Sequence, residues 1–204
     1  MRLFLLLLTL TPLNLWASDK GIDSSEDIFK SRCVSCHGEA TAALPVPRIM
    51  GQNRTFLFDE LIKFKTNKRT DLKMGVMPAM VQGYSDDELN DLAAYISKLN
   101  ECDAKITIEP LNGDLFKGKL LAKKHKCLSC HFALNPDSFG PIVEGQKTTY
   151  IAHALKSFRD KKQEDGKTVF LRKGSMMNAV AINLSDSDID SLAAFMNSKT
   201  RCKK

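Results

Sequence analysis

The chain has 204 residues, a formal net charge of +6 and an aromatic content of 7%. This composition is typical of a globular protein and shows no low-complexity tract. The basic residues are not interleaved with aromatic side chains, which disfavours a nucleic-acid-binding function. The charge is divided unevenly, because residues 19–102 contain 11 Lys/Arg and 13 Asp/Glu (net −2) while residues 103–204 contain 18 and 11 (net +7).

The first 17 residues have the pattern of a secretory signal peptide. Arg2 precedes the apolar run LFLLLLTLTPLNLWA, Ala17 is a small residue suited to cleavage, and polar sequence begins at Ser18. The run is short and is interrupted by Pro and Asn, so a retained membrane anchor is the weaker alternative. We expect residues 1–17 to be removed on export and the mature chain to work in the periplasm, an oxidising compartment.

The first motif of the mature chain is Cys33-Val34-Ser35-Cys36-His37. In an exported chain, Cys-x-x-Cys-His is the attachment signal for a c-type haem. Two cysteines three residues apart on a helix-like turn can form thioethers with the two vinyl groups of one porphyrin edge. The next residue, His37, then points its imidazole at the iron. The motif therefore predicts a covalently bound haem with a histidine ligand.

Two helices are expected further along this first unit. One spans residues 55–65, and the other follows Ser85, where Glu88 three residues later predicts a capping box. Its apolar stripe repeats with helical spacing and consists of Leu89, Leu92, Ala93 and Ile96. A further helix is expected to lead into the cysteine motif.

The second half of the chain repeats the first. Cys127-Leu128-Ser129-Cys130-His131 follows the first motif at an offset of 94 residues. Pro47, Gly51-Gln52 and Phe56 have partners at the same offset, namely Pro141, Gly145-Gln146 and Tyr150. Further on, the offset becomes 100, which indicates a polar, loop-like insertion of six residues near DKKQEDGKT. Helices are therefore expected again at 148–160 and after Ser185, where the cap is weaker.

The repeat defines the expected architecture. No convincing strand pattern is present, and the short KITI segment at 105–108 lies in the join between the repeats. We expect an all-α protein of two tandem domains, residues 18–102 and 113–204, connected by a linker at 103–112. Units of this size have small cores, and a buried porphyrin in each would add apolar volume.

The register of the repeat also predicts the second iron ligand. Met77 and Met177 are equivalent methionines, each eight residues before the cap serine of its unit. A thioether ligand favours ferrous iron and raises the potential. We therefore expect His37 with Met77 and His131 with Met177. The other candidates have weaker readings as core, pocket or surface residues: Met50, Met74, Met80, Met176, Met196, His125 and His153.

Two other chemistries could use the same cysteines. A zinc site would need Cys33, Cys36, Cys127 and Cys130 together, which leaves both following histidines unexplained. A dithiol redox site needs a thioredoxin-like βαβ setting, for which the chain lacks strands. Both are weaker than haem attachment.

With these motifs in place, each half resembles a class I cytochrome c domain, and the tandem resembles the dihaem cytochrome c4 family. The resemblance rests on CxxCH, P-x-x-x-G-Q and the closing M…LSDxDIxxLAAF segment, and it covers essentially the whole mature chain. It implies two covalently bound haem c groups with low-spin His/Met iron, two domains related by a pseudo-twofold, and soluble or peripheral periplasmic electron transfer to terminal oxidases. It also implies that the carbonyls of Pro47 and Pro141 hold the proximal histidines.

Cys102 and Cys202 remain after the haem cysteines are assigned. Because the mature chain is expected in an oxidising compartment, we expect a Cys102–Cys202 disulfide that ties the two units together. Two thiols, or a bridge to another chain, are the alternatives.

The predicted function is one-electron transfer between respiratory donors and a terminal oxidase or reductase, without enzymatic chemistry, since full coordination leaves no open iron position. One alternative is an electron-accepting subunit of a flavoprotein or dehydrogenase complex that oxidises sulfide, thiosulfate or alcohols. Another is a dihaem peroxidase or thiosulfate-oxidising enzyme, which needs a labile or non-Met ligand such as Cys102 or His125.

A basic segment precedes the second cysteine motif. Its lysines are predicted to dock an acidic redox partner, with a solvated helix face as the alternative. They are Lys117, Lys119, Lys123, Lys124 and Lys126.

Overall fold

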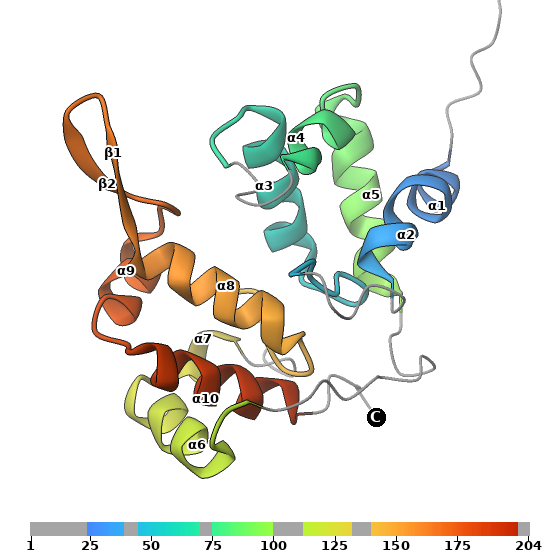
Figure 1. Ribbon diagram of the computed structural model, residues 1–204. Helices are drawn as coiled ribbons and strands as arrows, with labels where there is room; N and C mark the ends of the chain where they lie inside the picture. Colours follow the sequence, from blue (N-terminus) through green and yellow to red (C-terminus); the bar gives the residue numbers. More distant parts are fainter. Residues whose placement is uncertain (1–23, 39–44, 70–74, 100–111, 132–139, 200–204) are drawn as a thin grey trace, which may run out of the picture.

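The computed structural model describes residues 24–38, 45–69, 75–99, 112–131 and 140–199. The predicted signal peptide, Cys102, Cys202, Met74 and all but the last residue of the predicted linker lie outside these ranges. The described segments form two helical units (Figure 1), and the first unit contains α1 (Ser25–Ile28), η1 (Phe29–Cys33), α2 (Val34–His37), α3 (Arg54–Lys65), α4 (Val76–Val81) and α5 (Asp86–Lys98). The second unit contains α6 (Leu115–Lys124), α7 (Cys127–His131), α8 (Thr148–Arg159), β1 (Lys161–Glu164), β2 (Lys167–Phe170), α9 (Ser175–Ala181) and α10 (Asp186–Asn197).

The core of the first unit forms where α3 and α5 pack together and receive the segment that leads into the cysteine motif. Ser24 caps α1 by accepting from the backbone N–H of Asp27 at 3.2 Å. The chain then passes through the π-helical turn η1, which buries Phe29 next to Ile28 of α1. These two side chains join a cluster with Leu57, Leu92, Ala93 and Ile96.

The second unit is built around α10, which packs against α6 on one side and α8 on the other. Gly118 allows the close approach of α6, because a Cβ at this position would lie 2.7 Å from Cβ of Phe195 and would also strike the carbonyl oxygen of Ser191. The core of this unit consists of Ala122, Ile151, Leu184, Ile189, Leu192, Ala193, Phe195 and Met196.

The helix predictions are confirmed, except that the cap of the last helix is stronger than expected. Helices α3 and α8 lie within one residue of the expected 55–65 and 148–160. Ser85 and Glu88 form the full capping box at the start of α5. At α10 the cap is not weaker, since the side chain of Asp188 accepts from the backbone N–H of Ser185 and completes the same box.

The sequence predicts a loop for the polar insertion of the second unit, and this prediction is wrong. The insertion is an antiparallel hairpin. Strand β1 pairs with β2, from Lys161 opposite Phe170 to Glu164 opposite Lys167. The turn is Asp165-Gly166, with φ of 50° and 72°. An Asp-Gly pair in this left-handed conformation is the strongest short hairpin signal, and it outweighed the polar composition of the strands. The hairpin projects from the body of the second unit (Figure 1).

Two glutamines join the units in a reciprocal way. The side chain of Gln52 accepts from the backbone N–H of Ile142 at 2.7 Å and donates to its carbonyl at 3.0 Å. The side chain of Gln146 does the same to Arg48, at 2.8 Å for both bonds. Gln52 and Gln146 are related by the repeat offset of 94, and so are Arg48 and Ile142, so each unit presents the equivalent backbone segment to the equivalent glutamine of the other. This is the contact pattern of a pseudo-twofold. All four residues of the contact are shielded from water: Arg48, Gln52, Ile142 and Gln146 are buried.

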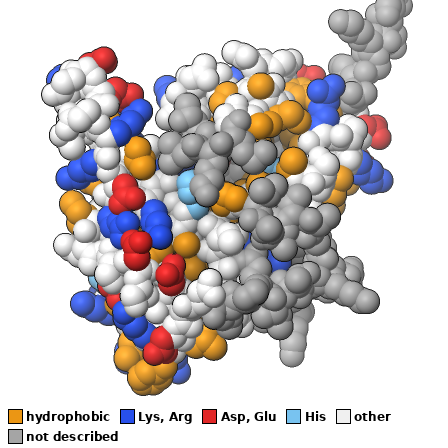
Figure 2. Space-filling view, viewed as in Figure 1, with side chains coloured by type: hydrophobic (Ala, Val, Ile, Leu, Met, Phe, Trp, Pro, Cys, Tyr) orange, Lys and Arg blue, Asp and Glu red, His pale blue; other side chains and the backbone are white. Residues whose placement is uncertain are grey.

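Apolar side chains gather at more than one place on the face that Figure 2 shows. One group is at its lower end, where α6 lies in Figure 1, and another is over the upper part of the first unit. Among the described residues, no helix combines the length and hydrophobicity needed to cross a membrane.

Candidate functional site

Both cysteine motifs fold as the short helical turns that haem attachment requires. Cys33 ends η1 and His37 ends α2, while Cys127 and His131 bound α7. The cysteines Cys33, Cys36, Cys127 and Cys130 are partly buried, and none of them is in a disulfide. One turn of helix brings residues i and i+3 to one side, so each pair can reach one edge of a planar group.

Each histidine is held by a proline carbonyl, as the resemblance implies. Nδ1 of His37 lies 2.8 Å from the carbonyl oxygen of Pro47, and Nδ1 of His131 lies 2.8 Å from that of Pro141. A carbonyl only accepts, so Nδ1 carries the hydrogen in both rings. This tautomer leaves the lone pair on Nε2, the nitrogen that a metal would need, and the bond fixes the orientation of the ring.

The surroundings of the second histidine keep it neutral. Burial lowers the pKa of His131, and the hydrogen bond to Pro141 opposes this only in part. Gly140 contributes to the burial, since a Cβ there would lie 2.6 Å from Nδ1 of His131 and 2.7 Å from the carbonyl oxygen of Cys130. The sequence reading missed this glycine, because Val46 stands at the equivalent place in the first unit and the repeat therefore does not mark it.

The glycine of each P-x-x-x-G-Q motif ties the histidine-holding segment to the last helix of its unit. Gly51 and Gly145 both have φ of 66°, a conformation that favours glycine. The N–H of Gly51 donates to the carbonyl of Ile96 at 3.0 Å, and that of Gly145 donates to Met196 at 2.9 Å. The segment that carries the proline carbonyl is therefore anchored on α5 and α10.

The methionine helices α4 and α9 hold the two candidate ligands. Met77 lies in α4, partly buried against the cluster of Phe64, Val81 and Leu89. Met177 lies in α9 and is also partly buried, whereas the adjacent Met176 is 71% exposed. Burial thus agrees with the register in separating Met177 from Met176. Of the remaining methionines, Met50 and Met80 pack against the cores of the first unit and Met196 is buried in that of the second.

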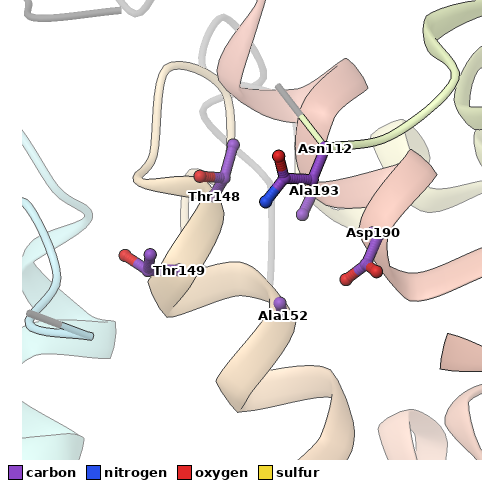
Figure 3. Close-up of a pocket in the computed structure, with 6 residues that line it drawn as sticks. All are labelled: Asn112, Thr148, Thr149, Ala152, Asp190 and Ala193. Carbon is purple, nitrogen blue, oxygen red and sulfur yellow. The ribbon is translucent and has the colours of Figure 1, made fainter. Parts of the chain in front are cut away.

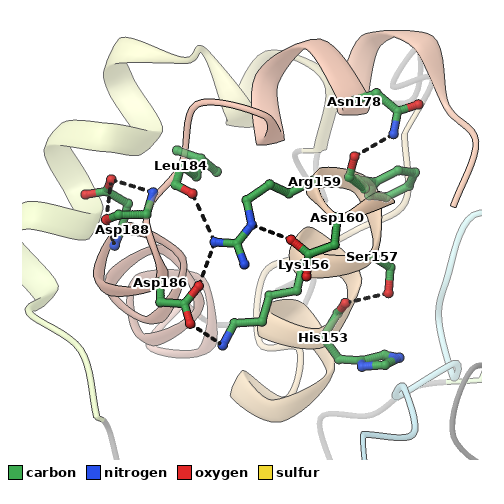
Figure 4. Close-up of polar contacts among 11 residues, drawn as sticks. His153, Lys156, Ser157, Arg159, Asp160, Asn178, Leu184, Asp186 and Asp188 are labelled. Carbon is green, nitrogen blue, oxygen red and sulfur yellow. Dashed lines mark hydrogen bonds and ion pairs between the residues drawn. The ribbon is translucent and has the colours of Figure 1, made fainter. Parts of the chain in front are cut away.

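Asn178 fixes the position of α9 directly after Met177. Its side chain donates to the carbonyls of Phe158 at 2.6 Å and Arg172 at 2.9 Å, and it accepts from the backbone of Gly174 at 2.8 Å. Figure 4 shows this bond to α8 near the ion pairs by which Arg159 and Lys156 hold Asp186 at the start of α10. The sequence reading did not single out Asn178, whose counterpart in the first unit is Pro78.

A polar cluster spans the two units beside the glutamine contacts. Glu60 of α3 forms ion pairs with Arg69 of its own unit and, at 3.2 Å, with Arg172 of the second unit. Burial favours the neutral form of Glu60, but Arg69 and Arg172, with Lys63, outweigh it and hold the pKa of this carboxyl below its usual value. Tyr150 contacts Arg69, and although its burial acts in the opposite sense, the two arginines lower the pKa of its hydroxyl.

The alternative chemistries receive no support from this geometry. No group of three or more His, Cys, Asp or Glu side chains in the described ranges is arranged to hold a metal ion, so the two cysteine pairs do not form one zinc site. Burial raises the pKa of Cys33 to about 11, and Cys36 acts in the same direction, while the positive charge of Arg32 opposes this only in part. A dithiol redox centre needs a depressed thiol pKa, so this site has the opposite property.

One small pocket lies between α8 and α10 (Figure 3). Its volume of about 130 Å³ is below the roughly 300–1,000 Å³ of typical ligand pockets. It contains no residue of the cysteine, histidine or methionine sets, so it is separate from the candidate site. The lining residues are Asn112, Thr148, Thr149, Ala152, Asp190 and Ala193.

Comparison with known proteins agrees with the two-unit site. Residues 21–96 match the family model described as cytochrome c oxidase, cbb3-type, subunit III, and residues 116–200 match the cytochrome c model. The chain is 30% identical over 179 residues to cytochrome c4 of Stutzerimonas stutzeri, which covers 80% of this chain and 82% of that protein.

Two solved structures share the fold. Reduced cytochrome c4 from Pseudomonas stutzeri superposes with a TM-score of 0.61 at 25% identity, covering 87% of this chain and 99% of that one. A thiosulfate dehydrogenase from Marichromatium purpuratum superposes with a TM-score of 0.67 at 22% identity, covering 83% of this chain but 36% of that one.

Two cytochrome c domains, each with a CxxCH turn and a carbonyl-held histidine, define a dihaem c-type cytochrome that carries electrons. The chain belongs to the cytochrome c4 family. It binds two covalent haem c groups. The observed residues fit that cofactor, because each unit offers a pair of unbridged cysteines and an imidazole whose Nε2 has the lone pair.

Proposed function

We propose that this cytochrome is a periplasmic carrier of single electrons between respiratory donors and a terminal oxidase or reductase, and not an enzyme. When bound, each haem supplies an iron that accepts and returns one electron. Cys33, Cys36, Cys127 and Cys130 hold the two groups covalently. His37 with Met77 would ligate one iron and His131 with Met177 the other, which would leave no position for a substrate.

The reciprocal glutamine contact is the observation that carries this proposal. Arg48 and Ile142, which the glutamines bind, directly follow Pro47 and Pro141, whose carbonyls hold the histidines. Each histidine-holding segment therefore lies at the boundary between the units. This arrangement supports passage of an electron from one site to the other within the protein.

Optical spectra of the haem-loaded protein test the ligand assignment. We expect two haems per chain, a low-spin ferric state and the red band of a methionine–iron bond at an intensity that corresponds to both sites. Met77→Ala and Met177→Ala should each remove about half of that band, because each variant removes one of the two expected methionine–iron bonds.

Met176→Ala and Met80→Ala are the matched controls, as they alter neighbouring methionines in the same helices. A band that disappears in a control variant, or a high-spin component in the unaltered protein, contradicts the assignment.

We also propose that residues 1–17 are removed on export and that Cys102 and Cys202 form a disulfide. Mass spectrometry of the exported protein should give a mature chain beginning near Ser18 and carrying two haems. Under non-reducing conditions it should also show Cys102 joined to Cys202. Two alkylatable thiols would remove the disulfide from the proposal, and a retained N-terminus would support the anchor alternative.

The partners are proposed to be redox proteins, and the one that meets the second unit is proposed to be acidic. The exposed Lys126 lies directly before Cys127, so it is the basic residue nearest to that attachment site along the chain. Opposite charges accelerate encounter, and salt screens them. A partner reduction rate that does not change with ionic strength would count against this docking.

A second candidate is an electron-accepting subunit of a dehydrogenase complex. The thiosulfate dehydrogenase with the same fold favours it, since the two matched units form only part of that protein. Purification of the protein from an extract of its native cells distinguishes the subunit role from the free-carrier role. A tight hetero-complex supports the subunit role, and an isolated dihaem chain supports the free carrier.

A further inference from the structure

Helix α6 has apolar residues on two opposite faces. On the inner face, Gly118 and Ala122 are buried against α10. On the outer face, Phe116 is 70% exposed and Leu120 is 51% exposed. Residues four apart lie on one side of a helix, so Phe116 and Leu120 form a continuous ridge, and they point away from the side that carries Gly118 and Ala122.

Lysines flank this ridge on both sides. At 100° per residue, Lys119 and Lys123 lie along one edge and Lys124 along the other, and all three are exposed. Residues 115–131 contain no Asp or Glu. We call Phe116, Leu120, Lys119, Lys123 and Lys124 the outer stripe of α6.

Lys117 is not part of the stripe. It forms an ion pair with Asp188 at 2.8 Å and donates to Ser187 at 3.0 Å. Its side chain therefore turns back onto α10. The sequence analysis groups all these lysines as one basic face, but in the structure Lys117 is separate from the others. The exposed apolar side chains between the remaining lysines are not evident from the charge pattern alone.

The outer stripe belongs to the second unit alone. The corresponding helix α1 of the first unit has the acidic residues Glu26 and Asp27 in its first turn, and its apolar residue Ile28 is buried. In Figure 1, α6 lies at one end of the molecule, on the opposite side of α10 from α8. The space-filling view shows apolar side chains at that end with Lys or Arg beside them (Figure 2).

We propose that the outer stripe of α6 docks the protein on an anionic phospholipid surface. An interfacial helix buries its apolar side chains at the boundary of headgroups and acyl chains, while lysines extend their aliphatic stems and keep the ammonium group among phosphates. Attachment that is more than marginal takes two contributions, here an apolar one and a basic one. The stripe has both, and the proposal is independent of the iron ligands and of the redox partners.

An acidic protein partner fits the stripe less well. Electron transfer requires that a partner approach the haem, whose attachment begins at Cys127. Phe116 lies nine residues before the end of the helical segment at His125, or about 14 Å along the axis. A surface that serves attachment can be remote from the haem, and Phe116 is the most exposed side chain of the stripe's apolar centre.

Co-sedimentation of the haem-loaded exported protein with vesicles tests the proposal. Equimolar phosphatidylcholine and phosphatidylglycerol form the anionic vesicles, and pure phosphatidylcholine forms the neutral ones. We expect binding to the anionic vesicles and little to the neutral ones. Replacing Lys119, Lys123 and Lys124 with Gln should lower the partition coefficient about fivefold for each lysine. The double variant Phe116→Ser, Leu120→Ser should lower it about tenfold or more.

Two control variants match these changes elsewhere on the second unit. Ile182→Ser removes another exposed apolar side chain, and Lys161→Gln with Lys162→Gln and Lys167→Gln removes the same charge from the hairpin. Neither control should change binding by more than about twofold if attachment depends on the stripe. Spectra of all variants should retain two low-spin haems, so a loss of binding is not a loss of fold.

Several outcomes would overturn the proposal. They are no binding to anionic vesicles, equal binding to neutral ones, or equal losses in the stripe and control variants. If vesicles do not bind and the stripe variants instead slow electron exchange with an acidic protein, the stripe is a protein-docking face. None of these results bears on the carrier function, which the spectra and small-molecule reduction measure separately.

Discussion

At the scale of single residues, the P-x-x-x-G-Q motif combines three separate duties in six positions. Pro47 offers a carbonyl to His37, Gly51 adopts a φ of 66° and bonds to α5, and Gln52 binds the backbone of the other unit. Pro141, Gly145 and Gln146 repeat these contacts. One short segment thus contacts the histidine, the last helix of its own unit and the backbone of the other unit.

Gly140 supports the first prediction. A Cβ at this position would lie 2.6 Å from Nδ1 of His131, so Gly140→Ala should displace the ring from the carbonyl of Pro141. We expect altered absorption and a shifted potential for one of the two haems, because the hydrogen bond to the ring orients the ligand and sets its basicity. Spectropotentiometry of the haem-loaded variant measures both.

Gly83→Ala is the control for this change, since no atom lies within 4 Å of the place where its Cβ would be. It should leave both haems as in the unaltered protein. If Gly140→Ala behaves like Gly83→Ala, the close contact does not constrain His131.

At the scale of helices and strands, the second unit depends on the crossing of α6 over α10. Gly118 is the point of closest approach. Gly118→Val should lower the free energy of unfolding of this unit by about 1–3 kcal/mol, because overpacking forces the helices apart. Denaturant unfolding followed by far-ultraviolet circular dichroism measures the loss.

Lys119→Val introduces the same β-branched residue at the next, exposed position of the same helix. Its effect should stay within about 0.5 kcal/mol, the usual range for a surface substitution. Equal losses in the two variants would show that helix propensity, and not the crossing, causes the effect.

The hairpin shows how local turn chemistry competes with composition. Its strands are mostly polar and exposed, so no alternation of apolar residues reveals them. Asp165-Gly166 sets the turn, and Leu171 then bonds to the carbonyl of Asp160 while Arg172 bonds to that of Ser157. The insertion thereby returns the chain to α8 and brings Arg172 to the interface.

At the scale of the whole molecule, the interface combines a symmetric and an asymmetric part. The glutamine contacts are reciprocal, but Glu60, Arg69, Arg172 and Tyr150 have no equivalent cluster across the pseudo-twofold. Ala154 stands at the position equivalent to Glu60, and Phe56 at that equivalent to Tyr150. The charged cluster therefore forms once at the interface, without a symmetric counterpart.

Glu60 supports a prediction on pH. Burial opposes its ionisation, but Arg69 and Arg172 keep its pKa in the folded protein below the usual 4.5. A depressed carboxyl pKa stabilises the fold above the unfolded value, and that stabilisation disappears as the pH falls through the folded one. The interface should therefore weaken below about pH 4.5.

Glu60→Gln should cost about 1.5–3 kcal/mol at pH 7, the usual range for a hydrogen bond to a charged group, and should flatten the acid limb of the stability profile. Unfolding free energies of both proteins between pH 7 and pH 3 provide the test. Asp59→Asn is the control, since it removes an exposed carboxylate at the preceding position of α3. An unchanged acid limb in Glu60→Gln would contradict the assignment.

Much of the fold was accessible from sequence because its signals are local. The CxxCH spacing, the capping boxes and the helical apolar stripes each involve residues within one or two turns, and the repeat offset assigned them to two equivalent units. The same register selected Met77 and Met177 as ligands, which remain predictions. Cys102 and Cys202 were assigned to a disulfide in the same way and lie outside the described residues.

The sequence by itself determined the class of protein, since covalent attachment and helix formation depend on neighbouring residues. Only the tertiary structure decided which side chains meet across the chain. Gln52 reaches Ile142 and Glu60 reaches Arg172 over separations of 90 and 112 residues, and no local pattern encodes such pairs. The exposure of Phe116 is likewise a tertiary property, because it depends on which face of α6 packs against α10.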